Sequence, residues 1–196
     1  MSLNDPWYEV VGADSLLDQG DLILRCPILT WDQTKPLKVS KAGDEELLKE
    51  HIASFRADVL VLTQACDLEH NKVRNVVLCP HRPVSEIRVA WDARMRQMGQ
   101  TPSAKAWRRY CEDIADGYVW NQVFLNSFES TGLTTELRVV DFHDLFTVPR
   151  EFLESLLRQR QEARLRLRPP YREHLSQAFA RFFMRVGLPQ PVNPSW

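Results

Sequence analysis

Two apolar runs separated by a short, mostly polar stretch constrain the fold most strongly. VLVLTQ at 59–64 and VRNVVLCP at 73–80 are rich in β-branched residues, a composition typical of strands. Because the connection between them is short, the two strands are expected to pair antiparallel as a hairpin centred near Glu69.

The rest of the chain mixes strand and helix patterns without regular β-α-β alternation. Strand patterns also cover 20–31, 118–125 and 137–143, the last two joined by an expected loop at 127–136. Helical patterns cover 43–54, 83–99, 103–117, 149–163 and 170–186, and Ser103 is expected to cap the third of them. Pro27 favours an edge position, a bend or a division into two short strands, and we interpret 20–31 as one bent strand. Together these elements predict an α+β fold, with a small, mostly antiparallel sheet or barrel, inserted helices and two C-terminal helices packed on the sheet.

Length and composition fit one domain. With 196 residues and 44% apolar content the chain can bury a substantial core. The stretch QPVNPSW is the linker-like segment, so we expect a single domain over 1–189 and a short tail over 190–196.

Charge and cysteine content limit the expected binding partners and cellular compartment. A net charge of -1 gives no overall attraction to nucleic acid or to an anionic membrane, so such binding would need a local patch. No run approaches about 18 consecutive apolar residues, and we expect a cytoplasmic protein that does not enter membranes. The four cysteines show no close pairing, which favours reduced thiols.

Arginines near the C-terminus form the candidate patch. They alternate or step by four across the join between the last two predicted helices, so several could face one way and bind the phosphates of RNA or DNA, or a protein partner; they are Arg158, Arg160, Arg164, Arg166 and Arg168. The alternative is a solvated face of ion pairs with Glu154, Glu162 and Glu173. In the helix at 170–186 an apolar face predicts core packing, with Arg181 pointing away from it.

Sulfur and imidazole ligands are numerous enough for a zinc site. The set Cys26, Cys66, Cys79 and His81 would complete a tetrahedron. In the expected hairpin, however, Cys66 lies beside the turn and Cys79 lies down the ladder, roughly 20 Å away at 3.3 Å per residue. We therefore expect no cofactor, and zinc is an alternative only if the hairpin is wrong.

The connection between the two central strands is itself a candidate site, formed by Gln64, Cys66, Asp67 and His70. In a structural interpretation Asp67 caps the turn and Asn71 adopts a left-handed conformation. In a chemical interpretation His70 activates Cys66 as a nucleophile, although the acidic neighbours disfavour a thiolate.

Several motifs resemble known families. GDLILRCP, VLVLTQACDL, VVLCP, VVDF and RLRLRPPYREHLSQAFARFFMRVGLP together resemble a bacterial protein family without an assigned function, over most of the chain. GDL, VLVLT and VVLCP are also distantly similar to the MazF/PemK toxins, which are SH3-like barrels that cut RNA. This second resemblance implies an SH3-like barrel, with Arg25 and Thr63 as matching positions. The chain departs from it at 56–58, where the toxins carry an Arg-Pro pair.

Three functions stay open at this point. The first is a bacterial binding or regulatory protein that contacts a nucleic acid or a protein, in a toxin-antitoxin or phage-defence setting that only the resemblance implies. The second is a metal-independent endoribonuclease of the MazF kind, using Arg25, Thr63 and His70 to deprotonate a ribose hydroxyl and stabilise the charged phosphorane. The third is a structural protein stabilised by zinc.

Overall fold

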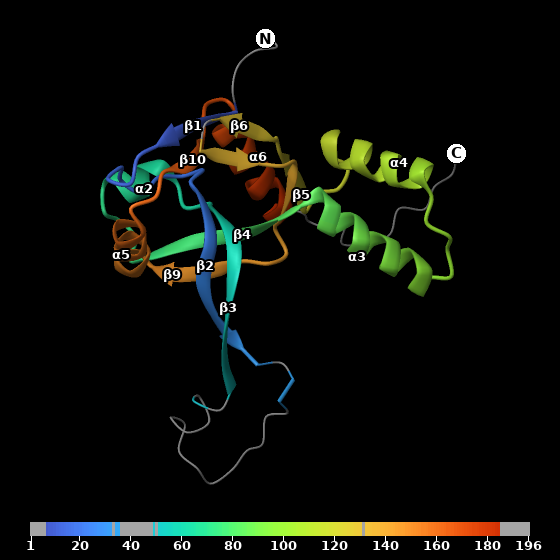
Figure 1. Ribbon diagram of the computed structural model, residues 1–196, viewed down its shortest axis with the longest axis horizontal. Coiled ribbons are helices and arrows are strands. Elements are labelled where there is room, and N and C mark those ends of the chain that lie inside the picture. The colour runs from blue at the N-terminus through green and yellow to red at the C-terminus, as the bar shows by residue number, and fades with distance from the viewer. Residues whose placement is uncertain (1–6, 33, 36–48, 50, 131, 185–196) are drawn as a thin grey trace. The chain divides into compact units, whose positions relative to one another are not determined.

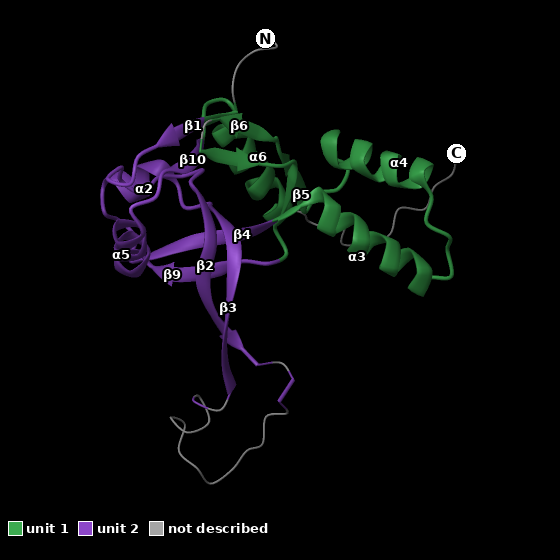
Figure 2. Ribbon diagram, in the orientation of Figure 1, with its two compact units in different colours: residues 1–8, 82–143, 167–196 green, residues 9–81, 144–166 purple. Residues whose placement is uncertain are grey.

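The computed structural model describes residues 7–32, 34–35, 49, 51–130 and 132–184 (Figure 1). Two compact units, each built from separate stretches of chain, make up the protein (Figure 2). Unit 1 comprises 1–8, 82–143 and 167–196, and unit 2 comprises 9–81 and 144–166. The single domain expected over 1–189 stays a prediction, and the tail expected at 190–196 lies outside the described residues.

Unit 2 is built on antiparallel strands. Strand β3 (Ile52–Val61) pairs with β2 (Leu22–Trp31) on one side and with β4 (Asn75–Pro83) on the other, and β9 (Phe146–Pro149) pairs with β4. A separate pair joins β1 (Tyr8–Val11) and β10 (Arg164–Leu167). Two helices complete the unit, α2 (Ala65–Glu69) and α5 (Arg150–Arg160).

The central hairpin is confirmed. Leu60 pairs with Cys79 across β3 and β4, and the connection contains the short helix α2 where a turn was expected. Asn71, just after α2, has the expected left-handed conformation with φ of 52°. The first strand is one continuous element, as expected, and its pairing with β3 shifts register between Ile23 and Cys26, while Pro27 itself is paired with Arg56.

The core of unit 2 lies between the sheet and α5. Branched side chains that alternate along β2, β3 and β4 meet Leu153 of α5 and Leu68 of α2 there; the sheet contributes Ile23, Ile28, Val59, Val61, Val76, Leu78 and Val148. Successive side chains of a strand point to opposite sides, so these residues share one face; Leu60 and Cys79, on the other face, are buried as well.

Unit 1 combines helices with short strands. It contains α3 (Val84–Gln97), α4 (Ala104–Ala115) and α6 (Tyr171–Phe183), with β5 (Gln122–Leu125) antiparallel to β8 (Arg138–Asp141). Ser103 caps α4 as expected, because its hydroxyl accepts a hydrogen bond from the backbone N–H of Ala106 at 3.1 Å.

Three sequence-based expectations need correction. The range 127–136, expected to be a loop, forms the hairpin of β6 (Phe128–Ser130) and β7 (Leu133–Thr135). The join expected between the two C-terminal helices contains strand β10. Most of the helix expected at 43–54 lies outside the described residues; Lys49 and His51 are helical, but β3 already begins at Ile52.

The α+β class is confirmed, since helices and antiparallel strands occur together. Among the described strands no pairing closes the sheet into a ring, so the SH3-like barrel is not confirmed. No helix within the described residues is both long enough and apolar enough to cross a membrane.

Candidate functional site

The residues matched to the toxins have structural partners. Arg25 lies in the bulge of β2 with φ of 50°, and its backbone N–H donates to Asp58 Oδ1 at 2.8 Å. The hydroxyl of Thr63 accepts from the backbone N–H of Val77 at 2.7 Å and is mostly buried. These contacts give each residue a partner within the fold, and a shared catalytic role for Arg25 and Thr63 stays a prediction.

The expected loop site is the short helix α2 and its ends. Cys66 is exposed, and its Sγ lies 3.8 Å from Gln64 Oε1 and 3.8 Å from Asp67 Oδ1. His70 ends the helix, and its backbone N–H donates to the carbonyl of Cys66. These contacts are local, and they describe a short helical turn more directly than a nucleophile with its base. Among the residues that the structure describes, no side chain caps the start of α2, and the Asp67 carboxylate contacts Cys66 and Lys72.

The four residues considered for zinc are not gathered. Cys26 and Cys79 are buried on different strands, His81 is buried in β4, and Cys66 is exposed on α2. Burial raises the pKa of the Cys26 thiol to about 11, although the nearby charge of Arg160 opposes this. Within the described residues no group of three or more His, Cys, Asp or Glu side chains is placed to hold a metal ion.

Two of the five C-terminal arginines belong to the interior of unit 2. Arg164 is buried; its Nε donates to Asp21 Oδ2 at 2.8 Å, and its Nη2 donates to the carbonyls of Ser15 and Leu16, both at 2.9 Å. Arg166 also donates to both carboxylate oxygens of Asp21. Burial would lower the pKa of Arg166, but the hydrogen bonds and charge of Asp21 outweigh it and raise that pKa.

The other three arginines are dispersed. Arg160 donates to the backbone carbonyls of Leu24 at 2.6 Å and Arg25 at 2.7 Å, and so stabilises the bulge of β2. Arg158 is exposed on α5, and Arg168 is exposed in unit 1. The expected phosphate-binding face does not exist as a unit, because Arg164 and Arg166 are directed toward Asp21.

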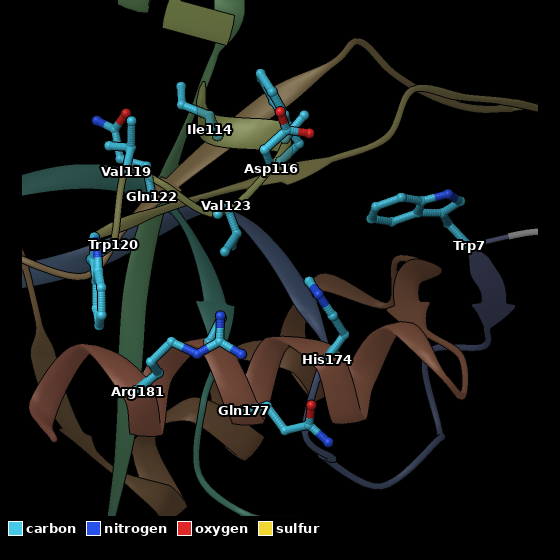
Figure 3. A pocket seen from close by; sticks show the side chains of 14 residues that line it. Trp7, Ile114, Asp116, Val119, Trp120, Gln122, Val123, His174, Gln177 and Arg181 are labelled. Atoms are coloured by element: carbon cyan, nitrogen blue, oxygen red, sulfur yellow. The ribbon is translucent and has the colours of Figure 1, made fainter. Parts of the chain in front are cut away.

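A cavity in unit 1 is the better candidate site. It has a volume of about 300 Å³, and its lining comes from Trp7, the C-terminal end of α4, the turn that leads to β5, β5 itself, and α6 (Figure 3). All of its lining residues belong to unit 1.

Helix α6 contributes a polar face to the cavity. His174, Gln177 and Arg181 follow the i, i+3, i+7 spacing that places residues on one side of a helix. In Figure 3 His174 and Arg181 rise from α6 toward the centre of the cavity. Within the described residues the guanidinium of Arg181 makes neither a hydrogen bond nor an ion pair. An arginine in this state can donate its planar fork to a ligand.

The opposite wall is the end of α4. The helix terminates in a Schellman turn, in which the N–H of Tyr118 donates to the carbonyl of Asp113 at 2.8 Å and the N–H of Gly117 donates to that of Ile114 at 3.1 Å. Gly117 adopts φ of 76°, the left-handed conformation that this turn requires. A Cβ at Gly117 would lie 3.9 Å from Arg181 Nη1, so the glycine brings bare backbone close to that guanidinium.

Aromatic rings stand at two sides of the cavity. Trp7 stacks on Tyr171 with ring centroids 4.2 Å apart and planes 15° apart, and the N–H of Arg168 donates to the carbonyl of Trp7. Trp7 lines the cavity and Tyr171 does not. The surface of Trp7 that faces the cavity is therefore the surface that Tyr171 leaves uncovered. Trp120 stands on the side of Arg181 (Figure 3) and is 48% exposed.

Hydrogen bonds hold the strand side of the cavity in place. Gln122 accepts from the Tyr110 hydroxyl at 2.6 Å and donates to Asp141 at 3.1 Å, and Asn121 donates to Asp141 at 2.9 Å. Burial would raise the pKa of Asp141, but the hydrogen bonds from Asn121 and Gln122 outweigh it and lower that pKa. Asp141 therefore stays ionised and keeps the amide of Gln122 in one orientation.

Sequence reasoning missed this site because its residues come from distant stretches of chain. Trp7, the end of α4 and α6 share no local motif. The available signal was the polar stripe of His174, Gln177 and Arg181 opposite the apolar face of the last helix, which predicts a helix side without a core partner.

Comparisons with protein-family models, with curated proteins and with solved structures find no match to this chain. The resemblances to a bacterial family and to the MazF/PemK toxins therefore stay predictions, and the case for function depends on the geometry of the cavity.

Proposed function

We propose that this protein is a nucleic-acid-binding module that receives one unstacked nucleotide of a single strand in the unit 1 cavity. The observation that carries the proposal is the combination of Trp7 and Trp120 with Arg181 and His174 around one space of about 300 Å³. Proteins recognise single strands by stacking bases on aromatic rings and by placing cations along the phosphates.

The size and composition of the cavity support this class of ligand. A volume of about 300 Å³ is at the lower end of the range for small-molecule sites, and it suits one nucleotide better than a duplex. Arg181 offers a planar guanidinium to a phosphate, and Trp7 offers a ring on which the base of the bound nucleotide can stack. Trp120, on the side of Arg181, offers a second ring for the next base of the strand.

The alternatives have less support from the geometry. An endoribonuclease of the MazF kind would need Arg25 and Thr63 to act together, whereas the backbone N–H of Arg25 is bound to the Asp58 carboxylate and the Thr63 hydroxyl to the N–H of Val77. A zinc-stabilised protein would need ligands that the described residues do not gather. A toxin-antitoxin or phage-defence setting depends on the resemblance alone.

Fluorescence anisotropy with short labelled single strands of RNA and DNA tests the proposal. We expect binding that weakens steeply as salt rises, because phosphate contacts release counterions. Trp120→Leu should weaken binding roughly tenfold or more, since a stacked base contributes about 1–3 kcal/mol.

Trp31→Leu is the matched control, because Trp31 is 58% exposed and lies on β2 in unit 2. It should leave the affinity unchanged. Absence of binding to any strand, or an equal effect of the two substitutions, would contradict the proposal. Capture of a protein partner that Trp120→Leu abolishes, without binding of nucleic acid, would assign the cavity to a protein ligand.

A further inference from the structure

We infer that the cavity holds a nucleoside monophosphate unit in one orientation, with its base against Trp7 and its phosphate at Arg181. This inference depends on the proposed function. It adds the chemical identity of the bound group and the roles of Trp7 and Arg181 in binding it. The shared chemistry is a base joined to an anionic phosphate, whether the unit is part of a strand or a separate nucleotide.

The Trp7 side is preorganised for a flat ring. Tyr171 and Trp7 already form a nearly parallel stack, and the backbone carbonyl of Trp7 is held by the N–H of Arg168 at 2.9 Å. A base placed on the uncovered part of Trp7 continues this stack as a third ring. Little conformational freedom is lost on binding, because the tryptophan is held before the ligand arrives.

The Arg181 side is suited to an anion. Its guanidinium makes no ion pair within the described residues, and Gly117 places no side chain beside it. Asp116, the acidic residue of the cavity lining, lies on the wall that faces α6 (Figure 3). Its carboxylate disfavours a phosphate on that wall, so a phosphate is expected on the α6 side. Charges of opposite sign on opposite walls orient a ligand that has one anionic end.

The spacing along α6 matches one nucleotide. His174 lies toward Trp7 and Arg181 lies toward Trp120 in Figure 3. Seven residues of helix separate His174 from Arg181, about 10 Å at 1.5 Å per residue. This is close to the length of a nucleotide from its phosphate to the far edge of its base, so one unit can reach both ends.

Isothermal titration calorimetry with adenosine and adenosine 5′-monophosphate separates the two ends. The unmodified protein should bind the monophosphate at least tenfold more tightly than the nucleoside, as charged hydrogen bonds predict. In Arg181→Gln this ratio should fall to about one while the affinity for adenosine is kept. Arg108→Gln, an exposed arginine of α4 outside the cavity lining, should leave both affinities unchanged.

Substitution of the tryptophan tests the base end. Trp7→Leu should weaken both ligands by the same factor, roughly tenfold, and Trp7→Phe, which keeps an aromatic ring, should weaken them less. Circular dichroism identifies a variant that fails to fold. Equal weakening of nucleoside and nucleotide in Arg181→Gln, or an unchanged affinity for adenosine in a folded Trp7→Leu, would overturn the orientation.

A short single strand, compared with the mononucleotide, identifies the source of the ligand. Tighter binding of the strand supports both proposals. Tighter binding of the mononucleotide supports the orientation but contradicts the proposal that the natural ligand is a single strand. If neither ligand binds, the proposed function and the orientation both fail. If strands bind but the Arg181 and Trp7 substitutions do not separate phosphate from base, only the orientation fails.

Discussion

Arginines of the two units are used in opposite ways. In unit 2, Arg164 and Arg166 converge on the buried carboxylate of Asp21 and on the backbone carbonyl of Leu16, so their donors are directed toward the protein. In unit 1, Arg181 reaches into a cavity, and within the described residues its guanidinium has no ion pair. The first arrangement stabilises a fold, whereas the second leaves the charge for a ligand.

The difference shows why a run of arginines is weak evidence for phosphate binding. Removing a guanidinium from water is costly, so an interior arginine requires a carboxylate and carbonyls of its own chain. Asp21 supplies the carboxylate, and the loop at 12–16 supplies carbonyls. Once these contacts form, few donors are left for a phosphate, and the number of arginines in a segment no longer indicates its function.

The largest effect is expected at Asp21. Asp21→Asn removes the charge that two guanidiniums share, and leaving a buried ion pair incomplete typically costs about 3–5 kcal/mol. Urea denaturation followed by circular dichroism should show a loss of this size in the free energy of unfolding. Asp144→Asn, an exposed aspartate of unit 2, should change that free energy by no more than about 0.5 kcal/mol. A loss at Asp21 no larger than at Asp144 would refute the stabilising role of the cluster.

An intermediate effect is expected at Arg160. Its two hydrogen bonds hold the carbonyls of Leu24 and Arg25, which the bulge of β2 leaves without ladder partners. Arg160→Gln should cost about 1 kcal/mol in the same denaturation assay, because water can replace part of this interaction.

Arg158→Gln on the same helix is the matched control for Arg160→Gln. Arg158 makes a long, exposed ion pair with Glu154 at 3.9 Å, so its loss should cost less than about 0.5 kcal/mol. If the two variants were equally stable, Arg160 would count as a surface arginine and would again be a candidate for partner binding.

The parts of the fold that sequence predicted are those with strong local patterns. The runs of branched residues at 59–64 and 73–80 identified β3 and β4, and Ser103 identified the start of α4. The strand RLRL, β10, was missed because four residues are too few to show a clear periodicity, and because its two arginines are typical of a solvent-exposed surface. Only the pairing of β10 with β1, together with Asp21, explains why those arginines are buried.

The candidate site was harder to predict than the fold, and for a physical reason. The zinc and nucleophile hypotheses used residues close in sequence, such as Cys66 and His70, whereas the cavity brings together Trp7, the end of α4 and α6. A local motif can be recognised in one segment, but a cavity depends on which distant segments pack together. The polar stripe on α6 therefore indicated an unusual helix face without indicating what stands opposite.

The smallest effect on stability is expected at Arg181, and this prediction separates the two uses of arginine most directly. Because its guanidinium has no ion pair within the described residues, Arg181→Gln should change the free energy of unfolding by no more than about 0.5 kcal/mol. Adenosine 5′-monophosphate should raise the melting temperature of the unmodified protein, since a ligand that binds only the folded state stabilises it, and this rise should be much smaller in Arg181→Gln. A loss above about 1 kcal/mol without ligand would place Arg181 with Arg160 among the structural arginines, and the contrast between the two units would then fail.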